Sequence, residues 1–230
     1  KLISFKTLIL SLPVWYLRFI FFNLRRVLMN KSFIIKIIVL CLLTIKAYSI
    51  EKVVLFGDSL MAGYGLSNEN HLSTVLQESL KLKGYNIEVI NGSVSGSTSS
   101  GGLNRAEWTL SEPDIDLIVL SLGANDMLRG IKPTETKSNL EKIIKIAQNR
   151  NIKVILAGMI APSSYGVNYK NNFDKIFPDL SKKYELEFIP FLLKGVAMKA
   201  EFNLSDGMHP NKKGTRIISR TLEEIILNNL

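Results

Sequence analysis

Between residues 51 and 230, short runs of apolar residues alternate with segments of helical periodicity. The apolar runs are rich in β-branched and aliphatic residues and alternate little with polar ones, which is typical of strands buried on both faces of a parallel sheet. Five runs are expected to form strands: residues 53–56, 87–90, 115–122, 152–157 and 186–189. The pattern therefore predicts a parallel five-stranded sheet.

Three further segments repeat apolar residues at helical spacing. They contain Leu72, Val75, Leu76 and Leu80; Leu140, Ile143, Ile144 and Ala147; and Ile217, Ile218, Leu222, Ile225 and Ile226. Regular alternation of strand and helix predicts an α/β fold, a three-layer α/β/α sandwich that binds ligands at the carboxyl ends of its strands. No linker, repeat or charge block divides residues 50–230, so we predict one domain there.

The charge of the chain is concentrated near its N-terminus. The chain has 230 residues and a formal net charge of +9, an excess that would ordinarily suggest nucleic-acid binding. Residues 1–49 hold eight basic residues and no acidic one, which leaves residues 50–230 with a net charge of +1. Because the predicted domain is nearly neutral, we expect no nucleic-acid partner.

The first 49 residues have the pattern of a targeting segment. A short basic region after Met29 precedes an apolar run over 37–45 and small residues just before position 50. This order predicts a signal peptide at 29–49, cleaved after Ser49, and a periplasmic or secreted protein. The run is shorter than the ~20 residues of a membrane-spanning helix, so no stable span is expected after cleavage. We interpret residues 1–28, with Pro13 and Arg18 interrupting their apolar stretch, as an upstream or non-native extension; a second membrane-associated segment is the alternative.

The single cysteine, Cys41, lies inside that apolar run. Leu40 before it is not small, so lipidation is not expected. The mature chain would then contain no cysteine, which excludes disulfides, thiolate metal sites and a cysteine nucleophile.

The first predicted strand ends in Gly57-Asp58-Ser59-Leu60. A serine directly after a strand can lie at a helix N-terminus, where its hydroxyl is exposed and its amide faces a ligand. Capping of the next helix by Asp58 or Ser59 is the alternative interpretation, and for an isolated Asp-Ser pair it is the more common one.

Polar segments also follow the next two strands. Residues 91–102 form a predicted Ser- and Gly-rich loop that contains Gly96 and lacks the spacing of a nucleotide-binding motif. The third strand ends in Gly123-Ala124-Asn125-Asp126. Asn125 could close a turn, but its amide is also suited to bind an oxyanion.

The chain has two histidines, His71 and His209. His71 opens a predicted helix, and we expect it to be structural or solvated. Asp206 precedes His209 by three residues, a spacing that lets its carboxylate hold the ring nitrogen that faces away from a serine. Two histidines without a carboxylate cluster make a poor metal site, so no metal is expected.

These segments supply every part that acyl transfer requires. Ser59 is the candidate nucleophile, His209 the general base and Asp206 the residue that orients it. The amides of Ser59 and Gly96 and the side chain of Asn125 would form an oxyanion hole. Their occurrence in chain order, each at the boundary of an element, makes the combined pattern far more specific than any one segment.

The same residues resemble the four blocks of the SGNH (GDSL) hydrolases, most closely the bacterial periplasmic thioesterase I, protease I, lysophospholipase and arylesterase branch. The resemblance rests on Gly57-Asp58-Ser59-Leu60, Gly96, Gly123-Ala124-Asn125-Asp126 and Asp206-Gly207-Met208-His209, and covers about residues 51–228. It implies a flavodoxin-like SGNH hydrolase fold, no cofactor, a Ser59-Asp206-His209 triad and an oxyanion hole of Ser59, Gly96 and Asn125. Two positions depart from the family pattern: Ser97 replaces a common Asp, and Ala124 a frequent Gly.

The resemblance further implies a serine esterase that hydrolyses acyl esters and thioesters, including acyl-CoA, aryl esters or lysophospholipids, through an acyl-enzyme. Met127 and Leu128 follow the block-three Asn and are expected to line an acyl pocket; Trp108, Tyr165 and Phe202 are cleft candidates more often found in cores. The alternatives are an SGNH carbohydrate O-acetyl esterase and a non-catalytic flavodoxin-like binding module in which Asp58 is the important group. We expect a monomer acting on a small molecule.

Overall fold

Residues 13–28, residue 35 and residues 50–230 are described by a computed structural model. The chain divides into two units, Lys1–Tyr48 and Ser49–Leu230. In the first unit, helix α2 spans Val14–Leu28 and begins directly after Pro13. Arg18 lies within this helix and does not interrupt it, because a charged side chain on an exposed helix can extend into solvent. The predicted signal peptide falls almost wholly on residues 29–34 and 36–49, which lie outside the described residues.

The second unit is built around a sheet of five parallel strands in the order β2-β1-β3-β4-β5. The strands are β1 (Lys52–Gly57), β2 (Glu88–Asn91), β3 (Leu117–Ser121), β4 (Lys153–Ala157) and β5 (Glu187–Ile189). All five strand predictions are confirmed. In the two central strands every residue from Val53 to Gly57 and from Leu117 to Ser121 is buried, which explains their continuous apolar sequence.

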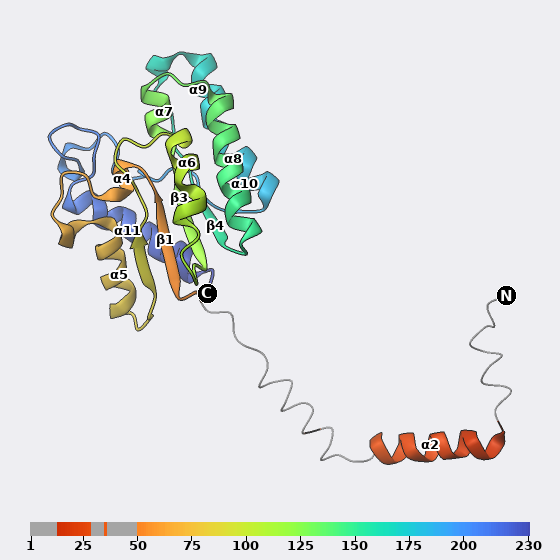
Figure 1. The fold of residues 1–230 in the computed structure, drawn as a ribbon. Helices are drawn as coiled ribbons and strands as arrows, with labels where there is room; N and C mark the ends of the chain where they lie inside the picture. Colours follow the sequence, from red (N-terminus) through yellow and green to blue (C-terminus); the bar gives the residue numbers. More distant parts are fainter. Residues whose placement is uncertain (1–12, 29–34, 36–49) are drawn as a thin grey trace. The chain divides into compact units, whose positions relative to one another are not determined.

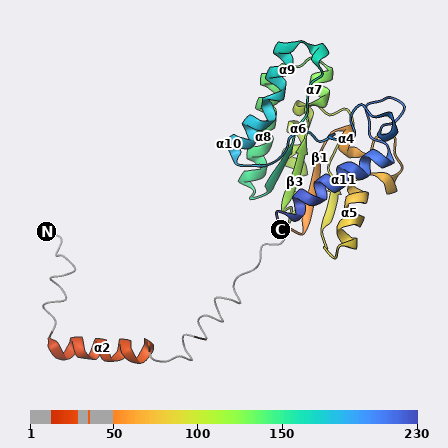
Figure 2. The ribbon, with the colours of Figure 1, turned by 180° about the vertical axis from the view of Figure 1, so that it is seen from behind.

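Helices cover both faces of this sheet (Figures 1 and 2). Helices α5 (Leu72–Leu82) and α11 (Lys212–Leu227) pack together on one face, and α6 (Ser99–Thr109), α8 (Pro133–Asn149) and α10 (Ile176–Tyr184) on the other. The shorter helices are α4 (Ser59–Ala62), α7 (Ala124–Leu128) and α9 (Val167–Asp174), with 3-10 turns at Asn68–Asn70, Ser163–Tyr165 and Ala200–Phe202. The three-layer α/β/α sandwich is therefore confirmed.

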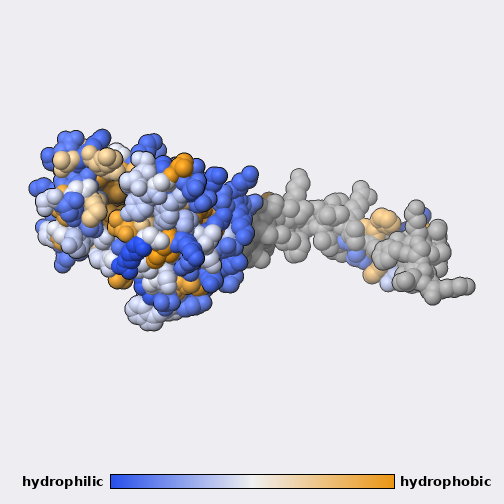
Figure 3. Space-filling model, turned by 90° about the horizontal axis from the view of Figure 1, so that it is seen from above, coloured by the Kyte–Doolittle hydropathy of each residue, from blue (hydrophilic) through white to orange (hydrophobic). Residues whose placement is uncertain are grey.

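The carboxyl ends of β1 and β3 lead directly into α4 and α7, which lie at the same end of the sheet (Figure 1). Because parallel strands all end at this edge, the segments that follow them meet there. Figure 3 looks down on this end of the protein and shows apolar residues among hydrophilic ones. None of the helices that the structure describes combines the length and the apolar composition needed to cross a membrane.

Candidate active site

Ser59 is the first residue of α4, and only Asp58 separates it from the end of β1 at Gly57. The Asp58 carboxylate accepts a hydrogen bond from the Leu60 amide at 3.1 Å and so caps the helix. The capping interpretation is therefore correct for Asp58, and it leaves the Ser59 hydroxyl available for another partner.

That partner is His209. The Nε2 atom of His209 lies 2.9 Å from Ser59 Oγ, and its Nδ1 atom lies 2.7 Å from Asp206 Oδ2. An ionised carboxylate can only accept, so Nδ1 of the neutral ring carries the hydrogen and Nε2 is free to accept the Ser59 proton. The structure thus joins the three residues predicted from the sequence in one hydrogen-bonded chain.

The segment before α11 holds His209 in this position. The His209 carbonyl accepts the Leu204 amide at 2.7 Å, which closes a tight loop, and Asn211 caps α11 by accepting from Lys213 and Gly214. The Tyr64 ring packs against the imidazole, with ring centroids 4.4 Å apart. The backbone bond to Leu204 and the Asn211 cap fix the main chain around His209, and the Tyr64 ring restricts the rotation of its side chain.

Asp206 is held in its ionised form. Hydrogen bonds from the His209 amide at 3.0 Å, from the His209 ring and from the Met208 amide at 2.9 Å lower the pKa of Asp206 to about 2. Donors to a carboxylate favour its charged form. Asp206 therefore remains an acceptor for His209 throughout the neutral range.

Asn125 lies on α7 and donates from Nδ2 to Asp58 Oδ2 at 3.3 Å. A side-chain amide has two N–H hydrogens, so one remains for a ligand. Asp58 is 1 % exposed, and burial raises its pKa to about 6 against the opposing hydrogen bonds from Leu60 and Asn125. The Asp58 carboxylate is thus buried and already bonded to Leu60 and Asn125, which argues against the binding-module alternative, in which Asp58 would be an accessible phosphoryl acceptor.

The raised pKa of Asp58 makes stability depend on pH. Between its ordinary pKa of 3.8 and about 6 the folded protein binds this proton more tightly than the unfolded chain, so raising the pH through this interval lowers the free energy of unfolding. The contribution is ~3 kcal/mol across the interval. Urea unfolding of wild type and Asp58→Asn at pH 4 and pH 7 should show this loss only in wild type; equal pH dependence in both would contradict the assignment.

Gly96 lies in the turn between β2 and α6 with φ +77°, a left-handed conformation that favours glycine. The Arg129 guanidinium, from the segment after α7, donates to the Gly96 carbonyl at 3.0 Å. Ser97, the first departure from the family pattern, donates its amide to Val94. The turn that carries Gly96 is thus hydrogen-bonded within its own loop, through the Ser97 amide, and to the segment after α7, through the Arg129 side chain.

The predicted loop over 91–102 is only partly a loop, because α6 begins at Ser99. Thr98 caps this helix by accepting the Gly101 amide at 3.1 Å. An added Cβ at Gly102 would lie 2.3 Å from the Leu122 side chain, so glycine here permits close packing of helix on sheet. Gly102 therefore serves helix packing, whereas Gly96 lies in the turn before the helix.

Asp126, next to Asn125, is fully buried. It accepts hydrogen bonds from the amide and hydroxyl of Ser99 and from the Thr136 hydroxyl at 3.1 Å. One carboxylate thus holds α6, α7 and α8 together beside the site. Sequence reasoning missed this role, since an Asp after Asn gives no sign of burial.

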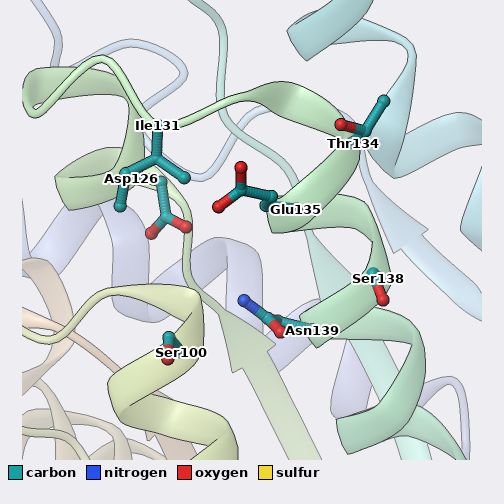
Figure 4. Close-up of a pocket in the computed structure, with 7 residues that line it drawn as sticks. All are labelled: Ser100, Asp126, Ile131, Thr134, Glu135, Ser138 and Asn139. Carbon is teal, nitrogen blue, oxygen red and sulfur yellow. The ribbon is translucent and has the colours of Figure 1, made fainter.

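A cavity of about 370 Å³ lies beside this cluster. It is lined by Ser100, Asp126, Ile131, Thr134, Glu135, Ser138 and Asn139. In Figure 4 the Glu135 and Asn139 side chains point from α8 toward Asp126 and Ser100. The cavity lining includes neither Ser59 nor His209, so it is a neighbour of the hydrogen-bonded chain and not its substrate cleft.

The other side chains named from the sequence, those expected near a pocket or cleft and His71, differ in their exposure and contacts. Met127 packs partly against the core and Leu128 is half exposed on α7. Trp108 is 81 % exposed, Phe202 packs against the core, and the Tyr165 ring contacts Tyr169. His71 places Nε2 3.1 Å from the Leu66 carbonyl.

Within residues 13–28, 35 and 50–230, no three His, Cys, Asp or Glu side chains group to hold a metal ion.

A parallel sheet with a serine, a histidine and a carboxylate in one hydrogen-bonded chain at its carboxyl edge is the arrangement of α/β enzymes that transfer acyl groups through a serine. The particular family follows from sequence. Residues 55–217 match the model of the GDSL-like Lipase/Acylhydrolase family, and the chain belongs to that family. This match confirms the resemblance noted from the motifs.

The chain is also similar to individual proteins with esterase and thioesterase names. An arylesterase of Vibrio mimicus is 34% identical over 180 residues, which cover 78% of this chain and 90% of the relative. The thioesterase 1/protease 1/lysophospholipase L1 of Escherichia coli K12 is 32% identical over 180 residues, 78% of this chain and 85% of its own. The crystal structure of TesA matches with a TM-score of 0.74 and 31% identity, covering 78% of this chain and 100% of that one.

Proposed function

We propose that this protein is a serine esterase that hydrolyses acyl esters and thioesters through an acyl-enzyme on Ser59. The observation that carries the proposal is the chain of hydrogen bonds from Ser59 Oγ through His209 to Asp206, at 2.9 and 2.7 Å. Relatives named arylesterase and thioesterase 1/protease 1/lysophospholipase L1 support this substrate class.

The proposed reaction has two halves. His209 Nε2 takes the Ser59 proton while Oγ attacks the substrate carbonyl carbon, and the resulting imidazolium is stabilised by the ionised Asp206. The imidazolium then gives its proton to the departing alcohol or thiol, which leaves an ester on Ser59. Water attacks that ester with His209 again as the base, releasing the carboxylic acid and restoring the serine.

The tetrahedral intermediate carries a negative oxygen that needs donors. We assign this role to the amides of Ser59 and Gly96 and to the Asn125 side chain. Asp58 fixes the Asn125 amide by accepting one of its two hydrogens at 3.3 Å, so the other is oriented before substrate arrives. Donors held in place in this way stabilise charge that develops only during reaction.

Asn125→Ala is expected to lower kcat by ~10²-fold or more and to leave KM nearly unchanged, since it removes a donor that acts mainly in the transition state. Steady-state hydrolysis of p-nitrophenyl butyrate measures both constants. Asn139→Ala, on α8 outside the proposed oxyanion hole, is the matched control. An Asn125→Ala enzyme with wild-type kcat would remove Asn125 from the oxyanion hole.

Apolar side chains around the site favour an acyl chain as substrate. Tyr64, Val94, Leu128 and Met208 are each about half exposed, and each follows a strand or lies in a segment at the carboxyl edge of the sheet. We propose that Met127 and Leu128 line the acyl pocket. Exposed apolar residues gathered at one site are typical of surfaces that bind apolar ligands.

A panel of p-nitrophenyl esters, acyl-CoA and lysophospholipid at matched concentrations tests the substrate class. We expect turnover of acyl esters and thioesters, with kcat/KM rising from acetyl to longer chains. Turnover of acetylated sugars alone would support the alternative, a carbohydrate O-acetyl esterase, and would contradict the thioesterase-like assignment.

We also propose that residues 29–49 are an export signal. Ile50, directly after the proposed cleavage point, is 2 % exposed and belongs to the hydrophobic core of the second unit, which supports a mature domain beginning there. Mass spectrometry of protein purified from its native envelope should find an N-terminus near Ile50 and a periplasmic or secreted location. An intact segment carrying Arg25 and Arg26 would favour membrane association instead.

A further inference from the structure

Arg105, on α6, connects two loops of the site through its guanidinium group. Its Nη2 donates to the Gly57 carbonyl at 2.9 Å, and its Nη1 donates to the Gly92 carbonyl. Gly57 ends β1, two residues before Ser59, and Gly92 begins the segment that leads from β2 to Gly96. The two carbonyls therefore belong to the two segments that carry the proposed backbone donors.

The segment after β2 continues to pair with the last residues of β1. The Gly92 amide donates to the Leu55 carbonyl at 3.0 Å, and the Val94 amide donates to the Gly57 carbonyl at 3.1 Å. Ser59 and Gly96 each lie two residues beyond this last pair. The separation of the Ser59 and Gly96 amides thus depends on the register of this pairing, and Arg105 donates to a carbonyl on each of the two segments.

The surroundings of Arg105 favour a specific role over an incidental one. Its guanidinium lies 4.0 Å from the centroid of the Phe56 ring, and burial lowers its pKa. Its Nε atom is buried without a hydrogen-bond partner among the described residues. Removing part of a charged group from water costs free energy. The planar guanidinium can donate to two carbonyls at once, which the single ammonium group of a lysine does poorly.

We propose that Arg105 is a positioning residue for the oxyanion hole: it fixes the end of β1 against the segment after β2 and so sets the spacing of the Ser59 and Gly96 amides. The proposal rests on the proposed function, because those amides matter only if an oxyanion forms between them. Arg105 contacts neither substrate nor Ser59 in this role and acts through the backbone.

Arg105→Lys and Arg105→Gln should lower kcat by ~10- to 100-fold while KM changes less than about 3-fold, because small displacements of transition-state donors reduce the chemical step and not binding. The pH profile of kcat should keep its shape, since His209 and Asp206 are untouched. Guanidinium at tens of millimolar should restore part of kcat to Arg105→Ala.

Arg150→Lys is the matched control. Arg150 also donates to a main-chain carbonyl at the end of α6, that of Leu110, and pairs with Glu107, but it contacts neither segment that carries an oxyanion donor. We expect wild-type kcat from Arg150→Lys, and no rescue of Arg150→Ala by guanidinium.

Thermal unfolding and titration with a fluorophosphonate probe give the folded and reactive fractions for each variant. Wild-type kcat per reactive site in Arg105→Lys and Arg105→Gln, or their unfolding below the assay temperature, would overturn the proposal and make Arg105 a structural residue. Failure of the proposed function would look different, because wild type itself would then neither bind the probe nor hydrolyse esters.

Discussion

Ser59→Ala is expected to lower kcat for p-nitrophenyl esters by about 10⁴-fold or more, because it removes the only group proposed to form the acyl-enzyme. KM should change little, since the hydroxyl contributes to the reaction and not to holding the acyl chain. The free energy of unfolding should be almost unchanged, because Ser59 Oγ is only part-buried and, within the described part of the chain, hydrogen-bonds to the His209 side chain alone.

Ser111→Ala provides the matched control for this prediction. The Ser111 hydroxyl donates to the Trp108 carbonyl at 2.7 Å on an exposed segment after α6, and its loss should leave kcat at the wild-type value. An Ser59→Ala enzyme with more than about one tenth of wild-type activity would mean that another group attacks the ester.

His209→Ala is expected to cost nearly as much as Ser59→Ala, because a serine without its base is not a nucleophile at neutral pH. The double variant Ser59→Ala/His209→Ala should be no slower than either single variant, since the two residues act as one unit. Steady-state assays at pH 7 to 8 with active-site titration measure all three.

His71, the other histidine of the chain, is the control. Its ring packs against the Gly63 backbone and the Leu66 carbonyl, so His71→Ala should lower the free energy of unfolding and leave kcat within a few-fold of wild type. Loss of activity in His71→Ala comparable to that in His209→Ala, at a temperature where the variant is folded, would contradict the assignment of the base.

The sheet could be predicted from sequence because its strands are buried on both faces. Val53 to Phe56 and Leu117 to Leu120 form uninterrupted apolar runs, and the structure buries every one of these residues. The three predicted helices were recognisable for a similar reason, since each turns one apolar stripe toward the core. Strand bounds shifted by one or two residues, as expected where the last residues of a strand are polar.

The features that could not be predicted from the sequence, namely the start of α6 and the roles of Arg105 and Asp126, depend on contacts between segments far apart in the chain. Gly101 and Gly102 disfavour helix locally, so the sequence predicts a loop where α6 begins, yet close packing of Gly102 on Leu122 stabilises the helix. Arg105 looks like an ordinary polar residue of a surface helix, and only the fold brings it to the Gly57 and Gly92 carbonyls. Asp126 was visible as a motif residue, but its three donors come from α6 and α8.

The candidate site was more predictable than the residues that support it. Ser59, Asn125, Asp206 and His209 lie at boundaries of elements, where polar residues after apolar runs are conspicuous. Supporting residues such as Asp58 and Tyr64 owe their roles to burial and to ring packing, which a single sequence does not record.

The proposed acyl-enzyme on Ser59 can be tested by trapping a covalent adduct at that residue. Intact-mass measurement after incubation with a fluorophosphonate should show one adduct per protein, and fragmentation of the tryptic peptides should place it on Ser59, with no adduct in Ser59→Ala. An adduct on any other residue, or equal labelling of wild type and Ser59→Ala, would rule out Ser59 as the nucleophile.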